Sequence, residues 1–146
     1  MQYDIEKLEI SPCTDTALLS VLCREMMEDE PADAIPADEE IRRRMDAFLA
    51  AGDVAYLFTA GGQTAGYALV IPGRSPVYLR HFTICRSHRR KGYGTQAFRL
   101  LLQALGVREM DLDVFVWNAR GNAFWQSLGF EPRATIMRYR DGIADK

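Results

Sequence analysis

The spacing of apolar residues in the N-terminal part of the chain predicts one strand followed by two helices. Residues 3–10 alternate imperfectly between apolar and polar, which fits a short strand at a sheet edge. Apolar residues then recur at helical spacing up to Pro31, and either Thr14 or Asp15 can cap this first helix. A second helical pattern follows Asp38, which can cap it in the same way.

Three strands are predicted in the middle of the chain. Residues 54–60 and 63–71 flank the pair Gly61-Gly62, and two glycines supply the positive φ angles that a tight hairpin turn needs. Residues 77–84 form a further strand pattern. These three strands follow one another with short connections, so we expect them to pair antiparallel.

The C-terminal part predicts helices alternating with strands. A helix over 94–105 joins the strand 77–84 to a strand at 110–116, so these two strands should run parallel. Asn118 can cap a helix that Gly129 closes, and residues 134–140 fit a last strand. The whole order predicts an α/β (α+β) fold with a mixed, mostly antiparallel central sheet and helices on both faces.

Length and composition indicate one domain over residues 1–146. The chain is 48% apolar, enough for one sizeable core, and has no apolar run of about eighteen residues and no signal-like N-terminus. We therefore expect a soluble, cytoplasmic protein without a membrane partner. Because the three cysteines form no C-x-x-C pair and only two histidines accompany them, we expect no metal site.

Charge is distributed unevenly despite a net charge of -2. Residues 73–108 hold eight basic and no acidic residues, whereas residues 25–40 hold eight acidic and no basic ones. The first segment suits an anion and the second a cation, although the acidic segment fits a solvated face equally well.

The basic segment contains a glycine loop between a predicted strand and a predicted helix. Arg89-Arg90-Lys91-Gly92-Tyr93-Gly94-Thr95 would aim backbone N–H groups, the positive end of a helix dipole and three cationic side chains at one point. Such a loop binds phosphate. The simpler alternative is that its glycines only shape a turn.

Four features in order resemble the Gcn5-related N-acetyltransferase (GNAT) family. They are the strand 78–84, the loop Arg89–Gly94 with the family's pattern (Arg/Gln)-x-x-Gly-x-(Gly/Ala), Asn118 after the next strand, and Leu128-Gly129-Phe130 at the end of the following helix. The resemblance covers roughly residues 54–132 and implies a GNAT-like sheet. It also implies acetyl-CoA as the co-substrate.

The resemblance assigns the donor site. The backbone N–H groups of residues 90–95 would hold the pyrophosphate, the pantetheine arm would pair with the strand like an added strand, and the N–H of Ile84 would stabilise the oxyanion. The residues implied in acetyl-CoA binding are Phe82, Thr83, Ile84, Arg89, Arg90, Lys91, Gly92, Tyr93, Gly94, Thr95, Asn118 and Trp125.

The proton chemistry departs from the family pattern. Trp125 stands where many members carry a tyrosine acid, and an indole does not release its proton near neutral pH. Tyr78 and Arg80 stand where members often carry a base, and neither is a ready base. His81 titrates in the right range, but strand alternation would turn it away from Tyr78 and Arg80. Ordered water is therefore the favoured base, with His81 as the alternative base and Tyr139 as a substitute acid.

The acceptor is expected to be an amine. Glu28 and Asp29 lie where the family's substrate loop falls, which favours a small cationic amine or a peptide amine, and Tyr78 and Arg80 are assigned to the same acceptor site. A homodimer is left open.

Three other functions compete with acetyl transfer. Because the usual acid and base are missing, the chain could bind acyl-CoA as a sensing module without catalysis. Residues 92–97 followed by Asp113 also fit a dinucleotide fingerprint, but the strand before the loop ends too early for it. No nucleic-acid partner is expected, because the basic stretch is compact and the protein is net acidic.

Overall fold

The computed structural model describes residues 7–30 and 34–142, and the chain divides into two compact units, Met1–Asp113 and Val114–Lys146. The first unit holds most of the regular structure. Its elements are β1 (Leu8–Pro12), α1 (Thr16–Asp29), α2 (Asp38–Ala50), β2 (Val54–Ala60), β3 (Gln63–Ile71), β4 (Val77–Ile84), the short 3-10 helix η1 (Arg86–His88), α3 (Tyr93–Leu105) and β5 (Met110–Asp111); the second unit contains α4 (Ala119–Ser127).

The five strands form one sheet in the order β1-β2-β3-β4-β5. The first three pairings are antiparallel, and β4 pairs with β5 parallel. The hairpin between β2 and β3 turns at Gly61 and Gly62, whose φ angles are 58° and 79°. This arrangement confirms the predicted mixed, mostly antiparallel sheet.

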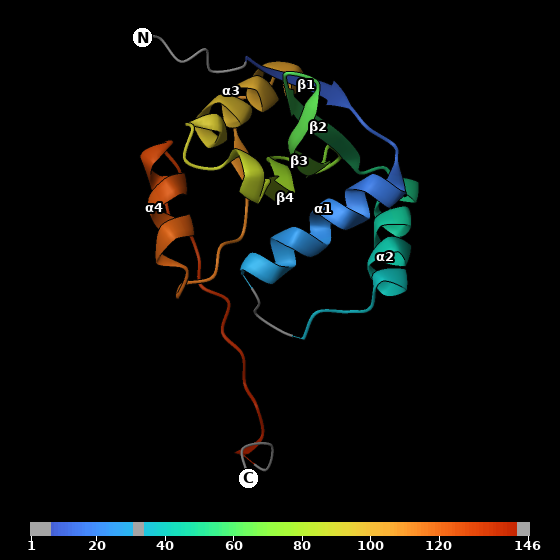
Figure 1. The fold of residues 1–146 in the computed structure, drawn as a ribbon. Coiled ribbons are helices and arrows are strands. Elements are labelled where there is room, and N and C mark those ends of the chain that lie inside the picture. The colour runs from blue at the N-terminus through green and yellow to red at the C-terminus, as the bar shows by residue number, and fades with distance from the viewer. Residues whose placement is uncertain (1–6, 31–33, 143–146) are drawn as a thin grey trace. The chain divides into compact units, whose positions relative to one another are not determined.

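Helices pack against both faces of this sheet, as the sequence predicts (Figure 1). On one face, Leu19 and Cys23 of α1 and Met45 of α2 share a buried cluster with Tyr67 and Leu69 of β3. The other face carries three rings in two successive edge contacts, which join β2 to β4 and β4 to α3. They are Phe58, Phe82 and Phe98, with centroids 5.8 and 6.5 Å apart.

Several element ends differ from the sequence-based expectation. Asp15 caps α1 by accepting from the Leu18 N–H, but α2 begins at Asp38 itself, after Ala37, without a side-chain cap. The first strand runs from Leu8 to Pro12, and the part expected at 3–6 lies outside the described residues. The strand expected at 110–116 comprises only Met110–Asp111.

The segment 134–140 contains no strand, although its sequence predicts one. Strand geometry depends on a hydrogen-bonded neighbour, and no described strand pairs with this segment. Its exposed side chains include Ile136, Met137 and Tyr139.

A β-bulge in β4 changes the direction of two side chains. Leu69 pairs with His81 and Val70 pairs with Leu79, so Arg80 is the extra residue on the bulged strand. Both Arg80 and His81 consequently contact Phe48 of α2. The alternation that would have separated His81 from Arg80 is therefore wrong at this point.

The second unit is built around α4. The Asn118 side chain accepts from the Gly121 N–H at 2.9 Å and so caps the helix, as predicted. The helix is followed by Gly129 at φ 104°, and Phe130 folds back so that its ring lies 5.2 Å from Trp125. Over the described ranges 7–30 and 34–142, none of the helices has the length and apolar character that crossing a membrane requires.

Candidate active site

The edge of β4 that faces β5 is covered over only a quarter of its length. β5 pairs with β4 at Val77 and Tyr78, and no other described strand lies on this side. The Cys85 N–H donates to the Ala65 carbonyl of β3 at 2.7 Å, and hydrogen-bonded positions alternate along an antiparallel ladder. The N–H of Ile84 therefore points to the opposite, uncovered edge, where an extended ligand could add like a strand.

The loop after β4 has the backbone geometry of an anion-binding nest. Arg90 adopts φ 63° and Gly92 φ 76°, and α3 begins at the next residue, Tyr93. Alternating left-handed residues turn successive N–H groups toward one point, and the helix N-terminus adds its partial positive charge there. Arg90 is the only non-glycine residue with positive φ among the described residues, which marks the loop as a functional candidate.

Two buried rings at this loop, those of His88 and Tyr93, pack against each other. His88 is buried, shares a 2.7 Å hydrogen bond with the Ser87 hydroxyl and packs against the ring of Tyr93 at 6.0 Å. Because the side chain of Tyr93 is buried as well, only its backbone is available to a ligand at the loop. The side chains of Arg90 and Lys91 are exposed at the same place.

The acidic end of α1 binds the first arginines of the loop. Asp29 accepts from the Arg86 Nε at 3.0 Å and also pairs with Arg89, while Glu28 pairs with Arg86 at 3.2 Å. Glu25 accepts from the backbone N–H of Arg86 at 2.6 Å. Burial alone would raise the pKa of Asp29, but hydrogen bonds from the two arginines outweigh it and lower that pKa.

Arg89 therefore has partners inside the protein. Its Nε donates to the Ile84 carbonyl at 2.9 Å, and its Nη2 pairs with Asp29. The predicted roles of Arg89 in cofactor binding and of Glu28 and Asp29 in acceptor binding stay predictions. In the structure these groups bind one another.

Three side chains from α1, β3 and β4 form a buried hydrogen-bond chain. Tyr67 hydrogen-bonds to the Cys23 thiol, and its Oη lies 2.9 Å from the His81 Nδ1. Burial and the neighbouring charge of Arg80 lower the pKa of His81 to about 4, so its imidazole is neutral at pH 7. Burial also raises the pKa of Cys23, so this thiol is protonated and not a nucleophile.

Arg80 is held between a carboxylate and a ring. Its Nε lies 2.8 Å from Oδ2 of the buried Asp53, and its guanidinium stacks on Phe48 at 4.1 Å. Tyr78 lies under Arg74, whose guanidinium is 4.3 Å from the ring centroid. Burial and the nearby Asp113 raise the pKa of Tyr78, which excludes it as a base near neutral pH.

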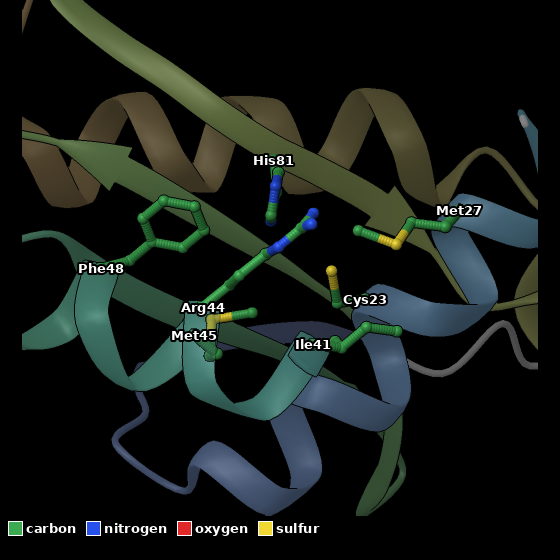
Figure 2. Close-up of a pocket in the computed structure, with 7 residues that line it drawn as sticks. All are labelled: Cys23, Met27, Ile41, Arg44, Met45, Phe48 and His81. Atoms are coloured by element: carbon green, nitrogen blue, oxygen red, sulfur yellow. The ribbon is translucent and has the colours of Figure 1, made fainter. Parts of the chain in front are cut away.

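A pocket of about 90 Å³ opens between α1, α2 and β4 (Figure 2). Figure 2 shows the Arg44 guanidinium reaching across the pocket toward His81, with the Cys23 thiol beside it. The lining residues are Cys23 and Met27 from α1, Ile41, Arg44, Met45 and Phe48 from α2, and His81 from β4.

Three predicted site residues lie in the second unit. Asn118 caps α4, Trp125 packs between Phe124 and Phe130, and Tyr139 is 88% exposed outside any helix or strand. Their assignments to acetyl-CoA binding and to proton transfer stay predictions.

The α2 side of the site carries no sequence motif. Asp53, Phe48 and Arg44 reach β4 or the pocket, yet none of them belongs to a motif. The helical spacing of Ile41, Met45 and Phe48 could have placed these residues on a face toward the sheet. The described residues include no group of three or more His, Cys, Asp or Glu side chains arranged to hold a metal ion.

Comparison with known proteins gives one family. A model of the acetyltransferase (GNAT) family matches residues 17–130, and no curated protein matches the sequence. Among solved structures, a possible acetyltransferase from Clostridium difficile 630 superposes with a TM-score of 0.73 at 14% identity, covering 93% of this chain and 99% of that one.

Two further solved structures have the same fold. An acetyltransferase from Thermus thermophilus gives a TM-score of 0.70 at 24% identity, over 87% of this chain and 88% of that one. AAC(6')-Iy, in complex with the bisubstrate analogue CoA-S-monomethyl-acetylneamine, gives a TM-score of 0.67 at 23% identity, over 92% of this chain and 98% of that one.

Proposed function

The chain belongs to the acetyltransferase (GNAT) family and is an enzyme of that type, and from this premise we propose that it moves the acetyl group of acetyl-CoA directly to an amine in a ternary complex. The observation that carries the proposal is the uncovered edge of β4 running into the left-handed loop at Arg90 and Gly92. An extended amide-bearing arm fits the edge, and a pyrophosphate fits the loop.

The donor site uses mainly backbone groups. The N–H groups of residues 90–95 would receive the pyrophosphate, assisted by the exposed side chains of Arg90 and Lys91. The pantetheine arm would lie along Phe82, Thr83 and Ile84. The Ile84 N–H would then donate to the thioester oxygen as negative charge develops on it.

The reaction needs a neutral amine. Its nitrogen attacks the thioester carbonyl carbon, the C–N bond forms, the C–S bond breaks, and CoA leaves as a thiolate. The amine proton passes to water in this proposal, because the low pKa of His81, about 4, makes it a weak base. Positioning and the Ile84 N–H then supply most of the acceleration.

The remaining assignments belong to the same proposal. Both units act as one N-acetyltransferase domain in the cytoplasm, without a metal or a nucleic-acid partner. Asn118 and Trp125 contribute to acetyl-CoA binding, and Tyr139 is kept as a candidate acid. A bisubstrate analogue joins CoA to acetylneamine in the AAC(6')-Iy structure, which supports direct transfer as the reaction type.

A cationic acceptor is the hypothesis that the acidic segment suggested. In the structure, however, Glu25, Glu28 and Asp29 carry arginine partners from the protein itself. The small cationic amine and the peptide amine are therefore retained only as alternatives for the acceptor assay.

Calorimetry and a thiol-release assay test this function. We expect acetyl-CoA to bind in preference to NADH, and free CoA to appear when a suitable amine is added. Preferential NADH binding would overturn the proposal. Acetyl-CoA binding without turnover on any amine, peptide or amino sugar would instead favour the non-catalytic acyl-CoA sensor.

One pair of variants locates the donor site. Gly92→Glu should weaken acetyl-CoA binding at least tenfold, because it puts a carboxylate among the phosphates. Gly62→Glu is the matched control: Gly62 has a similar φ of 79° and the same open space around an added Cβ, but it lies in the β2–β3 turn. Equal affinities for the two variants would show that the loop is not the donor site.

A further inference from the structure

The residues that line the pocket between α1, α2 and β4 favour one chemical class of acceptor. This inference rests on the proposed acetyltransferase function. Met27, Ile41, Met45 and Phe48 make most of its wall apolar. Its volume is about 90 Å³, which offers room for a short apolar side chain.

Arg44 gives this pocket its charge. None of the described residues that line the pocket is acidic, and the Arg44 guanidinium points into it (Figure 2). The Arg44 Nε lies 3.3 Å from Glu40, and the guanidinium end of Arg44 lies beside His81 and Cys23 (Figure 2). A guanidinium over an apolar pocket is a natural partner for a carboxylate.

The neighbouring acids are engaged elsewhere. Asp53 pairs with Arg80, and Glu28 and Asp29 pair with Arg86. Arg80 is itself paired with Asp53, so the charged group that lines the pocket is Arg44. A polycation would be repelled here, whereas a carboxylate would be attracted.

We infer that the acceptor is a small amine that also carries a carboxylate and a short apolar side chain, an apolar amino acid in chemical class. Arg44 binds the carboxylate, and the side chain enters the apolar pocket. His81 at the pocket wall lies three residues before Ile84, which is about 10 Å along the strand. The pocket and the proposed oxyanion donor thus lie on the same strand, β4.

Binding and turnover measured separately test this inference. The probes are L-methionine and L-leucine, compared with methioninamide and leucinamide, which keep the amine and the side chain but lack the carboxylate. Calorimetry on the full chain, with and without CoA, should show at least tenfold weaker binding of the amides, since a charge-assisted hydrogen bond is lost. In the thiol-release assay, kcat/KM should likewise be higher for the two amino acids than for their amides.

Two neighbouring arginines supply matched variants. Arg44→Gln should weaken L-methionine binding at least tenfold and leave acetyl-CoA affinity unchanged. Arg43→Gln should change neither, because Arg43 also pairs with Glu40 but does not line the pocket.

The outcomes distinguish the two proposals. Intact acetyl-CoA turnover with polycationic amines, together with no preference for the carboxylate, would overturn the inference and leave the acetyltransferase function standing. Arg44-dependent binding of L-methionine without any acetyl-CoA binding would support the pocket and overturn the proposed function. Equal L-methionine binding in the Arg44→Gln and Arg43→Gln variants would overturn the inference in either case.

Discussion

Arg80 is the residue at which β4 departs from regular strand geometry, and its charge affects the neighbouring His81. The bulge puts Arg80 and His81 on the same face, where both contact Phe48. Burial of the ring, together with the smaller effect of the positive charge of Arg80, disfavours protonated His81. His81 therefore acts as a neutral hydrogen-bond partner of Tyr67 at physiological pH.

This neutral histidine should make stability depend on pH in a defined window. Between pH 6.5 and about 4 the unfolded chain binds a proton at His81 that the folded chain does not, so the free energy of unfolding falls as pH is lowered. The full loss is on the order of 3 kcal/mol. Urea unfolding at several pH values measures it.

Replacement of His81 provides the control. His81→Gln should flatten this part of the pH profile. Parallel profiles for the wild type and His81→Gln would contradict the assignment.

The contact between α1 and the loop after β4 is an interaction between elements far apart in the sequence. The carboxylates of α1 form ion pairs with two arginines beside the proposed pyrophosphate site. The double variant Glu28→Gln/Asp29→Asn should therefore tighten acetyl-CoA binding a few-fold, because phosphates no longer compete with these carboxylates. Its free energy of unfolding should fall by about 1 kcal/mol or less, since the ion pairs are at the surface.

Asp38→Asn is the matched control for this effect. Asp38 belongs to the same acidic segment, but its partner is Arg24 at 2.9 Å. Calorimetry should give wild-type acetyl-CoA affinity for this variant. If the double variant has unchanged affinity for acetyl-CoA and a raised KM for cationic amines, the predicted role of Glu28 and Asp29 in acceptor binding would be supported instead.

The packing of β3 against β4 depends on Gly66. An added Cβ would lie 2.2 Å from the Thr83 carbonyl oxygen, so the strands would have to separate. Gly66→Ala should lower the free energy of unfolding by about 1–3 kcal/mol. It should also lower kcat at least tenfold, because Ile84 lies opposite Gly66 and its N–H would move.

Gly73→Ala serves as the comparison for Gly66→Ala. An added Cβ at Gly73 meets no atom within 4 Å, so both the free energy of unfolding and kcat should stay near the wild-type values. A Gly66→Ala variant as active as Gly73→Ala would show that this strand end does not hold the reacting group.

Local sequence signals predicted the elements well where residue type determines geometry. The hairpin follows from Gly61-Gly62, and the α4 cap follows from Asn118. The bulge at Arg80 could not be predicted, because it is a property of the pairing between β3 and β4 and not of the residue itself. The pairing of Asp29 with Arg86 likewise joins residues 57 positions apart, which no local pattern encodes.

At the scale of the whole molecule, exposed hydrophobic side chains are concentrated in one unit. Among the described residues, seven large hydrophobic side chains are strongly exposed, and only Val21 lies in the first unit. The other six are Phe115, Val116, Trp117, Ile136, Met137 and Tyr139. Exposed hydrophobic side chains that follow closely along the chain, such as Ile136, Met137 and Tyr139, are typical of surfaces that associate with protein.

We therefore expect the chain to form a homodimer through the segment that contains Ile136 and Met137, which are 78% and 89% exposed. Sedimentation velocity over a range of protein concentrations should show a dimer for the wild type. Ile136→Lys/Met137→Lys should shift it to monomer, because two charges would be buried on association. Val21→Lys, at an exposed hydrophobic position of the first unit, should leave the dimer intact. A wild-type protein that sediments as a monomer at every concentration would contradict the homodimer, and the exposed segment would then have no role in self-association.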